Sequence, residues 1–310
     1  DSKIQCPGRD TDHGSGGLFL KENTRGTLKM THILRSDFYK LRKARYFWVC
    51  LAVTVILAVG SVFLLDFTYR LAGDQMETQV ASQQETLEES GVSVSVEGVP
   101  LSYNELSGSG QLLSFFAGNT TLILAVLISL FVGSEFNHGT IKNMASRQYS
   151  RAALYVSKLI TGMAAGAFLT LVYVLFAAVT ASILWGFGPV SSGYWPRTLG
   201  GAGLELLLLF AFISVFVMFS FIIRQNGGSL AVNICFLEFL SLFAMLGEML
   251  VKKFTGKTMT LSNYLIDANM NALLGGLTRT SVIRALFVAA GFFLAALLIG
   301  MVHFQKRDIK

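Results

Sequence analysis

Charged residues and prolines are scarce in this sequence. Only 14% of its 310 residues are charged and four are prolines, while 53% are hydrophobic. Soluble domains carry about 25% charged residues. The composition therefore excludes an ordinary soluble or loop-rich chain and indicates an integral membrane protein.

Cysteine and histidine are also too scattered to form a recognisable site. Cys6, Cys50 and Cys235 are far apart and form no Cys-x-x-Cys pair. The four histidines form no His-Glu-x-x-His motif, so a metalloprotease is unsupported. Gly256–Thr258 resembles the end of a phosphate-binding loop, but that motif requires a glycine where Val251 stands. We expect no catalytic, metal, cofactor or nucleotide site in this chain, and no nucleic-acid partner.

Six apolar runs are long enough to cross a bilayer, which requires about 20 residues of helix. Backbone groups in lipid must find partners within the segment, so each run is expected to be an α-helix. The predicted spans are Phe47–Leu65, Leu112–Gly133, Leu159–Trp185, Gly203–Ile223, Ser229–Leu250 and Val282–Phe304. The predicted fold class is an all-α integral membrane protein with six transmembrane helices.

The distribution of basic residues predicts the orientation of these spans. Thirteen lysines and arginines fall on the side that holds both chain ends, and six fall on the other side. By the positive-inside rule, both termini are expected in the cytoplasm and the protein in the cell membrane. The lysines of Lys252–Lys257 favour the opposite orientation, but they are outnumbered.

The chain before the first span divides in two. Residues 1–29 are polar and contain no apolar signal-peptide core, so we expect a disordered or non-native leader. Residues 30–46 show helical periodicity, with Met30, Leu34, Phe38 and Leu41 on one stripe and basic residues elsewhere. This pattern predicts an amphipathic helix in the membrane interface, or else simply the solvated base of the first span.

A long acidic segment, residues 66–110, separates the first two predicted spans on the outer side. The alternation of Val92, Val94 and Val96 suggests a short strand. A small ordered cap and a flexible loop are both compatible with this segment.

The cytoplasmic loop over residues 134–158 contains two helix starts. Thr140 is placed to cap a short helix that carries Ile141 and Met144 on one side, and Ser150 is placed to cap the third span. A short apolar-faced helix with basic flanks is suited to docking a cytoplasmic partner. The alternative is an ordinary connecting loop that obeys the positive-inside rule.

The residues of this loop resemble the signature loop of type-2 ABC transporter permeases. The matching positions are Glu135, Gly139, Thr140, Ile141, Lys142, Ser150, Arg151 and Lys158. The interfacial helix is similar to the elbow helix of that family, and the resemblance covers residues 30–310. It implies the permease subunit of an ATP-driven exporter, working with a second permease copy and a separate ATP-binding cassette subunit that holds ATP and Mg. The family's loop forms a coupling helix, for which Met144 and Arg147 complete the expected contact set.

The acidic outer segment is similar to that of family members linked to peptide antibiotics, such as bacitracin or lantibiotic exporters. This similarity implies a peptide antibiotic or another amphipathic compound as the substrate, and a role in antibiotic resistance.

Polar residues within the predicted spans are candidates for a translocation path. Glu238 and Asn233 lie within the fifth span, where a carboxyl is costly unless it faces the bundle interior or water. A structural carboxyl bonded to a neighbouring helix is the alternative for Glu238. Glu205 is expected to reach the membrane interface. Gly162 and Gly166 predict a helix-packing face.

Two other function classes compete with the ATP-driven exporter. A secondary transporter would usually show internal repeats and helix breaks near the membrane midplane, and no similarity between the two halves is evident. A membrane-embedded enzyme would need a nucleophile or a metal-binding set, and neither is evident.

Overall fold

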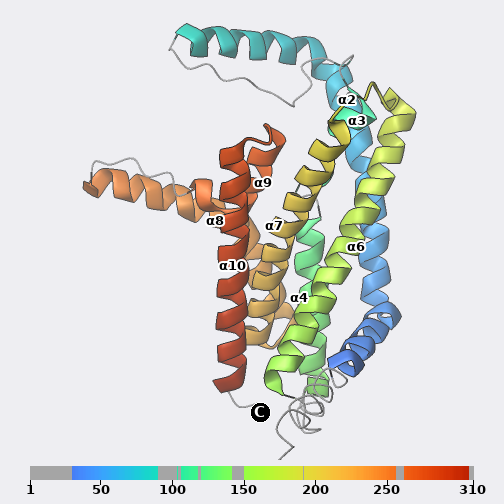
Figure 1. The fold of residues 1–310 in the computed structure, drawn as a ribbon, viewed down its shortest axis with the longest axis vertical. Coiled ribbons are helices and arrows are strands. Elements are labelled where there is room, and N and C mark those ends of the chain that lie inside the picture. Colours follow the sequence, from blue (N-terminus) through green and yellow to red (C-terminus); the bar gives the residue numbers. More distant parts are fainter. Residues whose placement is uncertain are drawn as a thin grey trace, which may run out of the picture.

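The computed structural model describes residues 30–89, 103, 106–117, 120–141, 150–190, 192–255 and 262–306, and their regular structure is entirely helical. Residues 30–43 form a helix, here called the elbow helix. The following elements are α2 (Arg45–Glu89), α3 (Gly108–Gln111), α4 (Thr121–Asn137), α6 (Arg151–Trp185), α7 (Tyr194–Ile223), α8 (Asn226–Thr255), η2 (Ser262–Tyr264), α9 (Ile266–Leu274) and α10 (Arg279–Lys306). Figure 1 shows α4, α6, α7 and α10 side by side along one axis.

Five of these helices are long and apolar enough to span a membrane. They are the Arg45–Leu71 part of α2, then α6, α7, α8 as far as Phe254, and α10. The protein is therefore a membrane-embedded helical bundle. The second predicted span, Leu112–Gly133, corresponds to α4, which has 17 residues and begins nearer the C-terminus than expected. Such a helix is about 25 Å long, slightly less than the hydrocarbon thickness.

The first predicted span extends much further than expected. α2 is helical to Glu89, through the first part of the segment 66–110 that was predicted as an outer loop. This extension is rich in Gln and Glu, residues with high intrinsic helix propensity, so the loss of hydrophobicity after Leu71 does not end the helix. Figure 1 shows the last part of α2 turned across one end of the bundle. The predicted strand at Val92–Val96 and the leader at residues 1–29 lie outside the described residues.

The elbow helix is present, but its buried stripe differs from the predicted apolar stripe. Ile33, Asp37 and Leu41 are buried at successive i, i+4 positions, whereas Phe38 is 42% exposed. The hydrophobicity pattern could not anticipate this rotation, because it depends on a charged partner for Asp37 on another helix.

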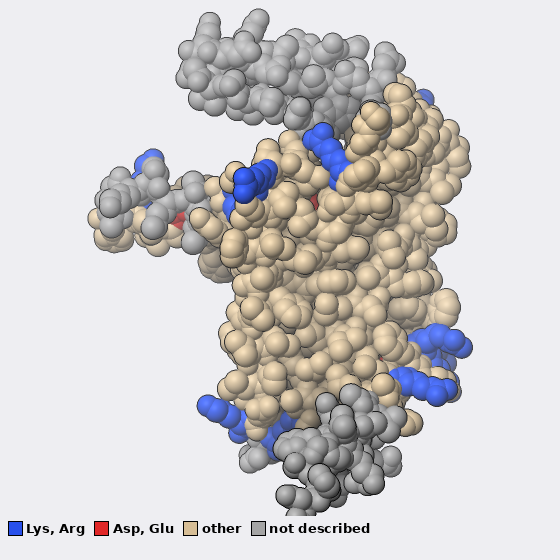
Figure 2. Space-filling view, in the orientation of Figure 1, with Lys and Arg blue, Asp and Glu red and all other residues tan. Residues whose placement is uncertain are grey.

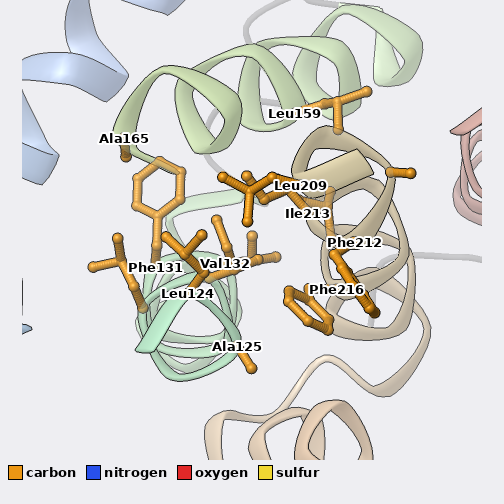
Figure 3. Close-up of a cluster of buried hydrophobic side chains, with 14 of the residues drawn as sticks. Leu124, Ala125, Phe131, Val132, Leu159, Ala165, Leu209, Phe212, Ile213 and Phe216 are labelled. Carbon is orange, nitrogen blue, oxygen red and sulfur yellow. The ribbon is translucent and has the colours of Figure 1, made fainter. Parts of the chain in front are cut away.

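The core lies where α4, α6 and α7 meet. Figure 3 shows the Phe131 ring of α4 beside Ala165 of α6, and Val132 of α4 on the side toward Ile213 and Phe216 of α7. Helices in lipid gain little from hydrophobic association, so close packing must hold them. The packing face predicted at Gly162 and Gly166 is confirmed. A Cβ at Gly162 would lie 2.8 Å from Ile128 Cδ1, and one at Gly166 would collide with Ile213.

Charge is confined to the ends of the bundle on the visible face. Figure 2 shows Lys and Arg side chains at both ends, with a broad uncharged band between them. The end that carries the elbow helix, the end of α4 and the start of α6 is called the elbow end below. At the far end, Asp66 Oδ1 of α2 accepts hydrogen bonds from Trp185 Nε1 at 2.9 Å and Tyr103 Oη at 3.1 Å. These bonds fasten the chain after α2 to the end of α6.

Candidate functional site

A buried cluster of charges joins three helices at the elbow end. Lys158 of α6 lies 2.6 Å from Asp37 Oδ1 of the elbow helix and 2.7 Å from Glu135 Oε1 of α4. The side chains of Asp37, Glu135 and Lys158 are 0%, 8% and 2% exposed, respectively. One ammonium group therefore bridges two carboxylates that belong to separate helices.

Further polar groups complete this cluster. Ser157 Oγ donates to Asp37 Oδ2 at 2.6 Å, so both oxygens of that carboxylate are bonded. Lys40, on the rim of the cluster, lies 3.2 Å from Glu135 Oε1. The Lys158 ammonium also lies 4.6 Å from the centre of the Phe131 ring, a distance suited to a cation–π contact. Two cations and two anions compensate each other, as groups withdrawn from water must.

The amino-acid sequence positions these groups through helix geometry. Asp37 occupies the middle of the buried i, i+4 stripe of the elbow helix, between Ile33 and Leu41. Ser157 and Lys158 are consecutive on α6, and together they bond both oxygens of Asp37. Sequence reasoning singled out Glu135 and Lys158 but missed Asp37, although an acid within a basic amphipathic helix is a signal that could have been used.

The loop between α4 and α6 begins and ends in defined turns. Gly139 has φ +67°, a left-handed conformation that glycine adopts without strain, and Thr140 Oγ1 donates to the Glu135 carbonyl at 3.0 Å. At the other end, Ser150 Oγ accepts from the Ala153 backbone N–H at 3.2 Å and caps α6 as predicted. Arg151 Nη1 donates to the Gln305 carbonyl of α10 at 2.9 Å.

The remaining predicted loop residues fall into two groups. Ile141 is 3% exposed and packs into the core of this chain, so its side chain is not presented to a partner as the predicted docking face required. The hydrogen bond from Thr140 Oγ1 to the Glu135 carbonyl keeps the chain after Gly139 against the end of α4. Lys142, Met144 and Arg147 lie outside the described residues.

An aromatic cluster lies at the same end of the bundle, between α4, α6, α7 and α10. The ring of Phe221 is 4.8 Å from that of Tyr155, 4.9 Å from that of Phe304 and 5.5 Å from that of Phe136. Tyr155 Oη donates to the Ala296 carbonyl at 3.1 Å. These contacts tie the start of α6 to the end of α10, and the sequence analysis did not predict them.

The two candidate path residues occupy different environments. Asn233 is 0% exposed, and its Nδ2 donates to Ser129 Oγ of α4 at 2.8 Å. It therefore joins α8 to α4 inside this chain. Glu238 is exposed and lines a cavity of about 210 Å³ together with Asp267 and Asn271 of α9. Because Thr121, the first residue of α4, lines the same cavity, Glu238 lies beside the start of α4 and next to α9.

Glu205 does not reach the membrane interface as the sequence analysis expected. It is 1% exposed, and neither of its carboxyl oxygens has a hydrogen-bond partner in the described part of the chain. The expectation was wrong because α7 begins at Tyr194, well before the predicted start of the span at Gly203. Glu205 is therefore several turns inside the helix.

One protein family matches the sequence. The family described as "Protein of unknown function (DUF2705)" matches residues 88–310, which is most of the chain and includes α4 and every helix after it. No curated protein matches the sequence. Among the described residues, no three His, Cys, Asp or Glu side chains are grouped so that they could hold a metal ion.

Proposed function

This chain belongs to the DUF2705 family, and we propose that it is the membrane-spanning permease subunit of an ATP-driven exporter. The observation that carries the proposal is the buried Lys158–Asp37–Glu135 cluster. It joins the elbow helix to both helices that flank the loop resembling a coupling loop. A force applied to that loop by an ATP-binding subunit would reach three helices at once.

The geometry suits transmission of movement. Glu135 lies two residues before the end of α4 at Asn137, and Lys158 lies two turns into α6, so the cluster lies directly behind both ends of the loop. Separating Lys158 from either carboxylate would leave buried charges uncompensated, which is costly in a medium of low polarity. The elbow helix, α4 and α6 are therefore expected to move as one body when the loop is pushed.

The proposed orientation places the elbow end in the cytoplasm. In this arrangement α4 is the second of six spans, because α3, the turns to Ala117 and α4 together provide enough chain to cross the bilayer. Glu238 and its cavity then lie toward the outer side, where a compound would leave. The path itself would form between two permease copies, with a cytoplasmic ATP-binding subunit beneath each.

A second candidate function is a secondary transporter. The specific observation in its favour is the interruption between α3, which ends at Gln111, and α4, which begins at Thr121, next to a cavity lined by Glu238 and Asp267. Discontinuous helices beside polar cavities are common at the binding sites of such proteins. The two candidates differ in their energy source, which can be measured.

The test is co-purification followed by reconstitution. The tagged chain is purified from solubilised membranes, and mass spectrometry is expected to identify an ATPase that contains the Gly-x-x-x-x-Gly-Lys-Ser/Thr motif. ATP hydrolysis by the reconstituted complex should depend on the permease. Transport that continues without ATP and stops when an ionophore collapses the ion gradient would instead establish the secondary transporter.

A variant of the loop tests the docking role separately. Met144→Asp with Arg147→Glu is expected to abolish recovery of the ATPase while the bundle still inserts and melts normally. Arg151→Glu is less suitable, because Arg151 also holds the end of α10 through the Gln305 carbonyl. The matched control is Arg279→Glu, a charge reversal at the start of α10. Full recovery of the ATPase with the loop variant would exclude this docking site.

A further inference from the structure

An apolar groove lies beside the elbow helix, next to its buried stripe. Its volume is about 390 Å³, and it runs between the elbow helix, the start of α2 and one face of α6. The residues that line it include Phe38, Leu41, Arg42, Trp48, Ala164 and Phe168. Phe38, Trp48 and Phe168 are 42%, 55% and 49% exposed, so substantial aromatic surface is open to whatever fills the groove.

The walls of this groove are fixed in place. Trp48 Nε1 donates to the Arg42 carbonyl at 2.9 Å, which holds the indole across the junction of the elbow helix and α2. Phe168 stacks on Phe47 with ring centres 6.3 Å apart. Leu41 is buried and packs in the hydrophobic core, which holds its side chain in place. The groove thus does not depend on its occupant for its shape.

Arg42 is the charged residue among the described residues that line the groove. Asp37, the acid of the elbow helix, is buried against Lys158 and contributes no negative charge to the surface. The basic side chains Arg35, Arg42, Lys43 and Arg45 are all exposed. Within the described part of the chain, the residues that line the groove include no acid, and Figure 2 shows Lys and Arg side chains near the elbow helix, at the lower right.

We propose that this groove binds one phospholipid with an anionic headgroup, its acyl chain along Phe38, Trp48 and Phe168 and its phosphate beside Arg42. An aromatic-lined apolar slot with cations at one mouth matches a molecule that is apolar along its length and negative at one end. Trp is favoured at the boundary between headgroups and hydrocarbon, where the elbow helix of a membrane protein lies. Arg pairs with phosphate through charge-assisted, bidentate hydrogen bonds. The lipid fills the space between the elbow helix and α6, and this assignment does not depend on the exporter function.

The experiment is native mass spectrometry of the purified full chain, titrated with phosphatidylglycerol or phosphatidylcholine. One phosphatidylglycerol should be retained, with an affinity about tenfold higher than that of phosphatidylcholine, because the choline ammonium of phosphatidylcholine competes with Arg42 for the phosphate and weakens that charge-assisted contact. Arg42→Gln should remove this preference, because it weakens retention of phosphatidylglycerol more than that of phosphatidylcholine, whose choline ammonium already offsets the phosphate charge. Ala164→Phe, or Ala164→Leu as a milder change, should block both lipids, because Ala164 is exposed within the groove.

Matched controls are Arg279→Gln and Ala231→Phe, which make the same changes at exposed positions outside the groove. Both are expected to retain lipid as the unchanged protein does. Equal affinity of the unchanged protein for the two lipids, or unchanged phosphatidylglycerol retention after Ala164→Phe, would overturn the proposal. Displacement of phosphatidylglycerol by inorganic phosphate would also overturn it, by showing an anion site rather than a lipid groove.

Discussion

Lys158 Nζ lies 2.6 Å from Asp37 Oδ1, although the two residues are 121 positions apart in the chain. The contact places the elbow helix against α6 and determines which of its faces is buried. It also explains why Lys158 can lie inside a helix that spans a membrane. Intramembrane lysines are rare and pair with carboxylates or carbonyls when they occur.

Removing this lysine should destabilise the bundle. Lys158→Met leaves Asp37 and Glu135 buried with less compensation, and the expected cost is about 3–5 kcal/mol. Thermal unfolding in detergent measures the change. Lys40→Met is the matched control, because the Lys40 side chain is 37% exposed and its ion pair should contribute at most about 1 kcal/mol. Similar melting temperatures for Lys158→Met and Lys40→Met would contradict the assignment of Lys158 as the central cation of the buried cluster.

A double variant should recover part of the loss. Asp37→Leu combined with Lys158→Met removes one buried charge of each sign, and apolar replacement of a buried ion pair is often neutral or stabilising. We therefore expect the double variant to melt above Lys158→Met alone. If the decrease in melting temperature of the double variant equals the sum of the decreases of the two single variants, the two residues do not interact.

Glu238 is expected to affect transport but not folding. Its carboxyl is exposed and lines the cavity it shares with Asp267, so Glu238→Gln should leave expression and melting unchanged. Loss of export by Glu238→Gln and by Glu238→Leu would assign the residue to the path. The control is Glu248→Gln, further along α8. Normal export by both Glu238 variants would show that the residue has no role in the path.

Asn233 is expected to have the opposite phenotype. Its Nδ2 reaches Ser129 of α4 and, at 3.4 Å, Ser220 of α7, so one amide connects three helices. Asn233→Ala should lower stability by about 0.6–2 kcal/mol, the range for interhelical hydrogen bonds in membranes. Ser129→Ala should lower stability by a similar amount. The Asn233→Ala, Ser129→Ala double variant should be little less stable than either single variant. Loss of export by Asn233→Ala without loss of stability would instead favour a direct transport role.

Cysteine labelling tests the proposed orientation. A single cysteine at Thr86, in a background without Cys6, Cys50 and Cys235, should react with a membrane-impermeant thiol reagent in intact cells. A single cysteine at Asn143 should react only after permeabilisation, because the basic asymmetry places that loop in the cytoplasm. The reverse pattern would show that the topology is inverted.

The positions of the helices were largely determined by local sequence. Runs such as Gly203–Ile223 and Val282–Phe304 fall inside α7 and α10, because lipid allows such apolar chain almost no structure other than a helix. The ends were less predictable. Polar residues with good helix propensity carried α2 to Glu89, and the interruption before Thr121 shortened α4, neither of which hydropathy alone reveals.

The sequence by itself determined that the chain enters a membrane, where its helices lie and which loop resembles a coupling loop. Those properties depend on the composition and spacing of neighbouring residues. Only the tertiary structure decided that Asp37, Glu135 and Lys158 meet, that Ile141 turns into the core and that Glu205 is enclosed. The physical reason is that a charged side chain is stable in the interior only beside a partner, and the partners here belong to helices far apart in the chain.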